Sequence, residues 1–205
     1  MGCKLFGKEK IMSISLQKGQ EVNLSKEKTG LTKVVVGVGW DETKSGKRKD
    51  GFVQAIDCDT IAFLLKNGKL RRQEDIVYFG NPQHKSGAVI HQSDNLAGAR
   101  EGDDEQIIID LLKVPRGYDK IEVVVNIYDA NSRMQHFGMI KNAFIRLVDE
   151  KTGEEICRYN LTDEYSGVTA MILGEVYRHN GEWKFNAVGQ GTKDTSIKKL
   201  VKCFE

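Results

Sequence analysis

The chain is dominated by short segments in which apolar and polar residues alternate or β-branched residues run together. Thr32–Trp40 (TKVVVGVGW) and Lys120–Tyr128 (KIEVVVNIY) are β-branched runs typical of buried strands. Strand patterning also occurs in residues 14–24, 52–65, 75–79, 88–91, 105–112, 143–148, 155–159, 168–177 and 182–188. Many short strands separated by glycine-containing turns predict a mostly all-β fold, a β-sandwich of two sheets.

Turn and helix signals complete this pattern. Glu150–Gly153 and Asn180-Gly181 each separate two strand candidates and predict hairpins, the Asn-Gly pair most strongly. Residues 132–137 predict a single turn or short helix, and residues 193–203 place apolar side chains at helical spacing. We therefore expect a few short helices, one of them near the C-terminus.

Charge and hydropathy narrow the functional classes. The chain has 31 basic and 29 acidic residues, so its net charge of +2 gives no bulk attraction to nucleic acid or membranes. The apolar runs are far too short for an integral membrane segment, and the first residues lack a signal-peptide pattern. We expect a cytoplasmic protein that does not bind nucleic acid, with residues 1–12 as a flexible tail.

Two groups of acidic residues are the main candidates for chemistry. Asp57 and Asp59 lie on a predicted strand, where alternation points both carboxylates to the same face and Cys58 to the other. A second group occupies the loop 93–105, with five carboxylates, one carboxamide and two glycines. Oxygen ligands without His or Cys favour calcium over zinc or copper. An exposed acidic strand end and an ordinary charged surface loop remain open as alternatives.

Enzymatic and anion-binding functions are further alternatives. Strand-end carboxylates also occur in metal-dependent hydrolases, and Cys58 between two acids would be the thiol of a detoxifying reductase. Neighbouring carboxylates raise a thiol pKa, which lowers its reactivity. The basic stretches Lys44–Lys49 and Arg71-Arg72 are candidates for binding a small anion such as a nucleotide. The alternative is that both stretches are ordinary solvated surface.

Several segments together resemble the TerD-type tellurite-resistance and general stress family. The resemblance spans residues 12 to 191, and residues 177–185 (YRHNGEWKF) are its most specific part. The other segments that carry it are residues 14–20, 35–41, 62–65, 93–95, 101–105, 137–138, 143–146 and 174–191. On this basis residues 13–191 form the β-sandwich domain and residues 192–205 a divergent, lysine-rich C-terminal segment.

The resemblance implies a non-enzymatic, calcium-binding stress protein whose partners are other proteins of a tellurite-resistance system. Family members bind calcium at acidic positions. These positions correspond here to Asp57, Asp59, Asp94, Asn95, Glu101, Gly102, Asp103, Asp104 and Glu105. Asp41, which follows the Gly-x-Gly-Trp motif, is a weaker metal candidate.

Two departures from the family pattern bear on how many ions this chain binds. Ala55 stands where the family usually has an acid, and Arg100 stands where glycine is usual. The first change removes a carboxylate ligand, and the second adds a positive charge beside the expected ions. We therefore expect one calcium ion, or weak binding.

Overall fold

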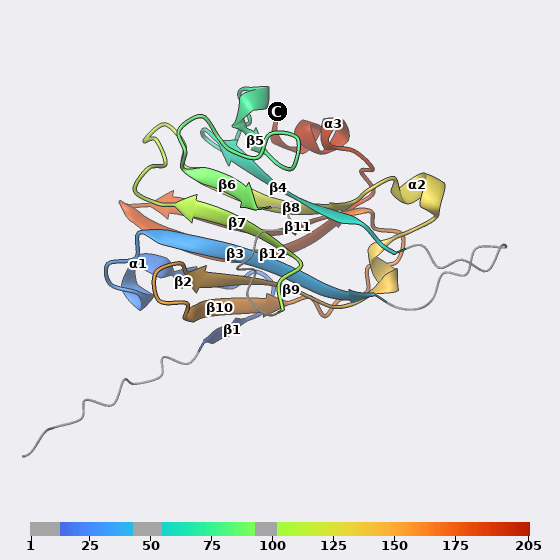
Figure 1. Cartoon of the computed structure of the whole chain (residues 1–205), viewed down its shortest axis with the longest axis horizontal. Helices are drawn as coiled ribbons and strands as arrows, with labels where there is room; N and C mark the ends of the chain where they lie inside the picture. The colour runs from blue at the N-terminus through green and yellow to red at the C-terminus, as the bar shows by residue number, and fades with distance from the viewer. Residues whose placement is uncertain (1–12, 43–54, 93–101) are drawn as a thin grey trace, which may run out of the picture.

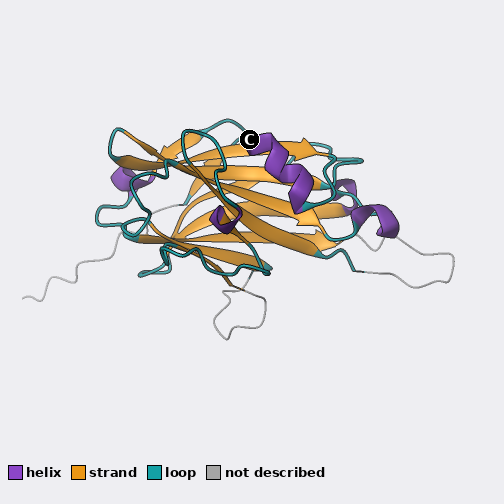
Figure 2. Cartoon of the chain, turned by 90° about the horizontal axis from the view of Figure 1, so that it is seen from above, coloured by secondary structure: helices purple, strands orange, loops and turns teal. Residues whose placement is uncertain are grey.

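The computed structural model describes residues 13–42, 55–92 and 102–205. Its strands form two six-stranded sheets, and the few short helices lie at the margins of the strand layers (Figures 1 and 2). In the first sheet the strand order is β1-β10-β9-β3-β7-β6, and in the second it is β2-β12-β11-β8-β4-β5. The expectation of a mostly β, two-sheet fold with a short C-terminal helix is confirmed.

Neighbouring strands are antiparallel except for β1 and β10, which are parallel. The strands of the first sheet are β1 (Ile14–Leu16), β3 (Lys33–Glu42), β6 (Val89–Gln92), β7 (Glu105–Asp110), β9 (Ile140–Asp149) and β10 (Glu155–Asn160). Those of the second are β2 (Glu21–Asn23), β4 (Cys58–Leu65), β5 (Ile76–Val77), β8 (Lys120–Ile127), β11 (Ala170–His179) and β12 (Glu182–Thr192).

The helices differ from the sequence-based expectation in their limits. They are α1 (Leu24–Glu27), α2 (Ala130–Arg133) and α3 (Ile197–Leu200), with 3-10 turns η1 (Gln73–Asp75), η2 (Phe137–Met139) and η3 (Val201–Phe204). The helix expected over 132–137 ends at Arg133, because Met134 adopts a left-handed backbone with φ 53°. The helix expected over 193–203 begins only at Ile197 and is divided into α3 and η3.

The turn between β11 and β12 confirms the hairpin predicted from Asn180-Gly181. Both residues have positive φ, 51° and 81°, as a type I′ turn requires. Only residues that tolerate the left-handed region fit both positions, so this dipeptide fixes the register of the longest hairpin in the described chain.

The main hydrophobic core lies between the sheets. Inward-facing side chains of β3 and β7 meet those of β4 and β8, and most are completely buried. Examples are Val34, Val36, Ile107, Ile109, Ala62, Leu64, Val123 and Ile127. Because two adjacent inner strands of each sheet contribute, this core holds the two layers in a fixed relation and sets where side chains at their open edges meet.

A second hydrophobic cluster covers part of the outer face of the second sheet. Ile61 and Phe63 of β4 point away from the inter-sheet core and pack under Leu200 and Phe204 of the C-terminal helices. The rings of Phe63 and Phe204 lie 4.9 Å apart. The segment after β12 is thus packed against the sheet through its apolar side chains.

Beside this cluster, the same outer face carries a buried carboxyl pair. Glu122 of β8 lies directly between Phe63 of β4 and Glu175 of β11, and Asn186 of β12 continues the row. Burial, and then the charge of Glu175, raises the pKa of Glu122 from 4.5 to about 8. Lys120, 3.6 Å from Glu122, partly offsets the repulsion. The pair therefore keeps a proton at neutral pH.

Glu122→Gln is expected to stabilise the fold above neutral pH. When folding raises the pKa of a group, that group contributes its full stability below the pKa of the unfolded state. The contribution is lost as the pH rises through the pKa of the folded state, which for Glu122 means between 4.5 and about 8. Glutamine removes this loss, so the free energy of unfolding should rise by about 1–2 kcal/mol near pH 8 and change little near pH 4. Urea unfolding at the two pH values measures the difference. Glu74→Gln, at an exposed site, is the control, and equal effects of Glu122→Gln at both pH values would contradict the assignment.

Candidate functional site: an acidic edge between the sheets

The sequence-predicted acidic residues fall into two separate places in the fold. Asp57, Asp59 and Glu105 meet at the open edge between the sheets, where Glu105 at the start of β7 reaches β4 and α2 lies beside the start of β4 (Figure 1). Asp41, Gly102, Asp103 and Asp104 lie together on the outer side of the first sheet. The predicted residues Asp94, Asn95 and Glu101 lie outside the described residues.

Asp59 has an asparagine as its direct neighbour. It is paired in register with Asn126 of β8, and directly opposed residues of an antiparallel pair share a face of the sheet. Asn126 is buried, and its Oδ1 atom has no hydrogen-bond partner among the described residues. A buried carbonyl oxygen without a donor is costly, so a carboxylate and an unsatisfied oxygen stand side by side here.

Glu105 connects the two sheets at this edge. It begins β7 in the first sheet, yet its Oε2 atom accepts a hydrogen bond of 2.6 Å from the backbone N–H of Thr60 in the second. Within β4, the pairing with β5 extends only over Ala62 and Phe63, so the N–H of Thr60 lies on an unpaired stretch of strand edge. The carboxylate of Glu105 is thereby held close to Asp59.

The convergence of these acids perturbs Asp59. Burial is the largest cause of a raised pKa at Asp59, and the charges of Asp57 and Glu105 add to it. The pKa rises from 3.8 to about 6. Two neighbouring basic side chains act in the other direction. Arg133 of α2 lies 3.8 Å from Asp57, and His91 of β6 lies 3.5 Å from Glu105. These two side chains offset only part of the effect of burial and of the neighbouring carboxylates on the pKa of Asp59.

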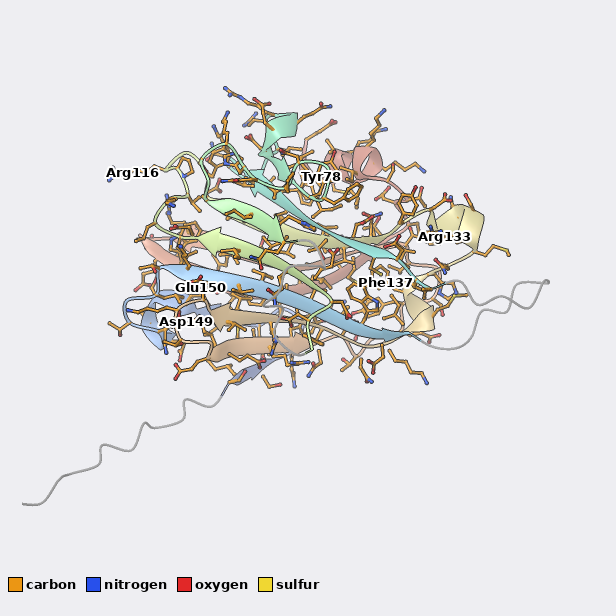
Figure 3. All side chains as sticks on the ribbon, viewed as in Figure 1. Tyr78, Arg116, Arg133, Phe137, Asp149 and Glu150 are labelled. Carbon is orange, nitrogen blue, oxygen red and sulfur yellow. The ribbon has the colours of Figure 1, made fainter. Side chains whose placement is uncertain are left out.

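Arg133 belongs to an exposed corner of the site. It projects from α2 at one end of the sandwich (Figure 3), and its guanidinium lies 4.9 Å from the centre of the Tyr128 ring. Asp57 is 58% exposed at its side chain, so its ion pair with Arg133 is largely solvated and contributes little to stability. This corner leaves one carboxylate of the edge accessible from solvent.

Asp103 has a different environment from the rest of its loop. Its side chain is 0% exposed, and Oδ1 accepts a hydrogen bond of 2.6 Å from Nε of Arg146. Gln106 donates to its other oxygen at 2.9 Å. The carboxylate lies over Gly37, where an added Cβ would come within 2.3 Å of Oδ2. The geometry assigns Asp103 a structural ion pair that joins the segment before β7 to β9 across Gly37 of β3.

Asp41 and Asp104 line a pocket of about 390 Å³ on that same outer side. Oδ2 of Asp104 accepts a hydrogen bond from the backbone N–H of Trp40, and Oδ2 of Asp41 accepts one from Nδ2 of Asn142, each at 2.7 Å. Gly102, Phe144 and Arg158 also line it, with Arg158 stacked 3.6 Å from the Phe144 ring centre. Its two arginines, Arg146 and Arg158, offset two of its three acids, whereas the edge around Asp59 has one arginine, Arg133, beside three acids.

The described residues do not form a complete metal site by themselves. Within residues 13–42, 55–92 and 102–205, no group of three or more His, Cys, Asp or Glu side chains is arranged to hold a metal ion. The edge offers Asp57, Asp59 and Glu105 together with the oxygen of Asn126. These are ligand types that suit a hard cation, and a soft or imidazole-binding metal would find few of its preferred donors here.

Three contributors to the edge were not singled out from the sequence. Asn126, His91 and Arg133 lie 67, 32 and 74 residues from Asp59 in the chain, and only the sheet pairing and α2 bring them close. Asn126 did carry a signal, because it interrupts the otherwise apolar end of Lys120–Tyr128 with a buried polar residue.

The groups invoked for the alternative functions are placed as follows. Cys58 is buried and faces the inter-sheet core, as strand alternation predicted. Arg71 and Arg72 are exposed, and Lys44–Lys49 lie outside the described residues. Every helix in the described part of the chain is too short or too polar to cross a membrane.

The fold and the acidic edge define a two-sheet β-sandwich with oxygen-rich, negatively charged side chains where the sheets open. Comparison with known proteins identifies its lineage: residues 12–204 match the TerD domain, and the chain belongs to the TerD-domain family of stress and tellurium-resistance proteins. The expectation drawn from the resemblance is thus confirmed at the level of the family.

Three individual comparisons illustrate the relationship. The chain is 50% identical to the stress response protein SCP2 of Bacillus subtilis over 93% of its own length and 98% of that protein. It is 49% identical to the tellurium resistance protein TerD of Serratia marcescens over 88% and 91% of the two chains. The crystal structure of a homologue of TerD from Streptomyces coelicolor has 18% identity and a TM-score of 0.62 over 86% of this chain and 99% of that one, which supports the fold.

Proposed function

We propose that this TerD-family protein is a calcium-binding module of a stress or tellurium-resistance system, without catalytic activity of its own. The supporting observation is the pairing of Asp59, a carboxylate crowded by Asp57 and Glu105, with the unsatisfied Oδ1 atom of Asn126. A divalent cation would offset the repulsion and supply the partner that the oxygen lacks.

Calcium fits this edge better than other metals. Carboxylate and carboxamide oxygens are hard donors, and calcium accepts irregular arrangements of six to eight such ligands, whereas magnesium demands near-ideal octahedral geometry. The described residues would hold the ion through Asp57, Asp59 and Asn126, with Glu105 completing the charge balance from the other sheet. Ala55 brings no carboxylate to this strand end; its carbonyl instead accepts a hydrogen bond from Gln135 at 3.3 Å. One ion is therefore proposed.

The consequence of binding would be a defined surface at the edge between the sheets. Without a cation the carboxylates repel one another, and with one they are drawn to a common centre. Partners are proposed to be other proteins of the same resistance system, which would recognise the ordered edge. A thiol-based detoxifying function has less support, because Cys58 and Cys157 are both buried and burial raises the pKa of Cys157 to about 12.

A pair of asparagine variants tests the metal site. Asn126→Ala removes the oxygen beside Asp59, and we expect calcium affinity in isothermal titration to fall by about tenfold, or ~1.4 kcal/mol. Asn186→Ala is the matched control, because Asn186 also lies on the outer face of the second sheet and its Oδ1 also lacks a partner among the described residues. The control should bind calcium as the wild type does. Equal affinities of the two variants would count against a site at Asn126.

A further inference from the structure

Two stretches far apart in the sequence form one strongly basic surface, which we call the basic end. It consists of residues 66–74, which follow β4, and residues 193–205, which contain α3 and η3. Together they hold eight basic and three acidic residues, a net charge of +5, whereas the whole 205-residue chain carries +2. The rest of the chain therefore carries a small net negative charge, and the net positive charge of the protein comes from this end.

The two stretches are fixed against each other. The backbone N–H of Leu70 donates a 2.7 Å hydrogen bond to the carbonyl of Phe204. Leu70 also packs against the cluster that contains Leu200 and Phe204. Figure 1 shows the C-terminal helices beside the segment that leads into β5, and Figure 3 shows many nitrogen-tipped side chains projecting from this end.

The cations of the basic end point outward, and most of them have no anionic partner among the described residues. The exposed basic residues are Lys69, Arg71, Arg72, Lys193, Lys198, Lys199 and Lys202. Within the described part of the chain, the ion pairs of this surface are those of Glu74 with Arg72 at 4.0 Å and with Lys85 at 3.8 Å. A surface of like charges that is not neutralised internally favours an anionic partner.

We propose that the basic end docks the protein on the surface of an anionic lipid bilayer. The side chains of Leu200 and Phe204 are committed to the sheet, so the helices present cations and little apolar surface to the outside. Attachment is thus electrostatic and reversible, through lysine and arginine side chains on lipid headgroups.

The structure favours a bilayer over other polyanions. A nucleic acid reader needs an element that enters a groove or exposed aromatic rings on which bases stack. Here α3 has four residues, and the rings of Phe63 and Phe204 are buried, with Tyr78 partly buried against them. Of the aromatic residues in and beside this cluster, only Phe79, next to Tyr78, is mostly exposed, and a single ring does not make a platform for successive bases. A bilayer presents a continuous field of mobile anions, which matches scattered flexible cations without requiring a shaped groove.

Vesicle co-sedimentation tests this proposal. The full chain is mixed with vesicles of phosphatidylcholine and phosphatidylglycerol in equal parts, or of phosphatidylcholine alone, at about 0.1 M salt. A chelator is present, so that calcium cannot bridge lipid and the acidic edge, and the result is independent of the proposed calcium site. We expect binding to the anionic vesicles only, roughly tenfold weaker at about 0.5 M salt.

Two charge-reversal variants make the test specific. K198E/K199E/K202E changes the basic end, and K18E/K141E/K151E makes the same charge change on residues outside it, all of which are exposed. We expect the first to lose at least about tenfold in vesicle binding and the second to stay within about threefold. Circular dichroism melting establishes that both are folded; should the triple change fail to fold, K69E/R71E replaces it.

Absence of wild-type binding to anionic vesicles would overturn the proposal. So would equal losses in the two variants, which would mean that only the overall charge matters. Salt-sensitive binding to duplex DNA or to polyglutamate without binding to the vesicles would also overturn it, because the partner would then belong to another class.

Discussion

Replacing Asp59 with asparagine is expected to raise the stability of the calcium-free protein and to abolish its stabilisation by calcium. The pKa of Asp59 is raised to about 6, so its contribution to stability is complete below 3.8 and is lost as the pH rises through about 6. At neutral pH the ionised form opposes folding, and asparagine removes that opposition. Because Asp59 is partly solvated, we expect a gain of about 1 kcal/mol without calcium. Urea unfolding at neutral pH, with a chelator or with calcium, measures both effects.

Higher stability without calcium, combined with loss of the stabilisation by calcium, distinguishes a metal site from a surface carboxylate. Glu164→Gln changes an exposed carboxylate and should alter neither quantity. At about pH 4 the gain from Asp59→Asn should disappear, because the wild-type carboxyl is then protonated in the folded state. A variant that loses stability without calcium and keeps its response to calcium would rule out this role for Asp59.

The second large effect concerns Asp103. Asp103→Ala is expected to lower the free energy of unfolding by about 3 kcal/mol, because it leaves the guanidinium of Arg146 without its most buried partner. Glu155→Gln removes the other carboxylate near Arg146, 3.3 Å from Nη1 and more exposed, and should cost well under half as much. Chemical denaturation of both variants in the presence of a chelator measures the difference.

The same experiment separates two roles of Asp103. The resemblance to the family places it among calcium ligands, whereas its hydrogen bonds to Arg146 and Gln106 link β9 to the start of β7. A structural role requires loss of stability without calcium. Unchanged stability in chelator combined with weaker calcium binding would instead make Asp103 a ligand.

The sequence predicted the architecture well because strand patterning is local. Thr32–Trp40 and Lys120–Tyr128 coincide closely with β3 and β8, and Asn180-Gly181 forms the expected turn. The prediction of a single C-terminal helix was less accurate. Phe204, which lies beyond the predicted limit, turned out to be part of its anchor, because burial against Phe63 depends on a partner far away in the chain.

The site was predictable in its chemistry and less so in its grouping. The sequence treats Gly102–Glu105 as one acidic loop, but Gly102 has φ 102° and β7 begins at Glu105. The chain therefore turns between them, so that Asp103 lies on the outer side of the first sheet and Glu105 reaches the other sheet. Residue type reveals what a side chain can bind. The neighbours of that side chain depend on strand register, which brings Arg146 to Asp103 and Asn126 to Asp59.

Thermal melting of the wild-type chain, first stripped with a chelator and then supplied with calcium, tests the central claim most directly. At a calcium concentration about a hundredfold above the dissociation constant, binding to the folded state adds about 2.7 kcal/mol. For a chain of this size the melting temperature should then rise by roughly 5–10 °C, with a smaller rise in magnesium. An unchanged melting temperature, together with no heat of calcium binding in calorimetry, would contradict the proposed calcium site at the acidic edge.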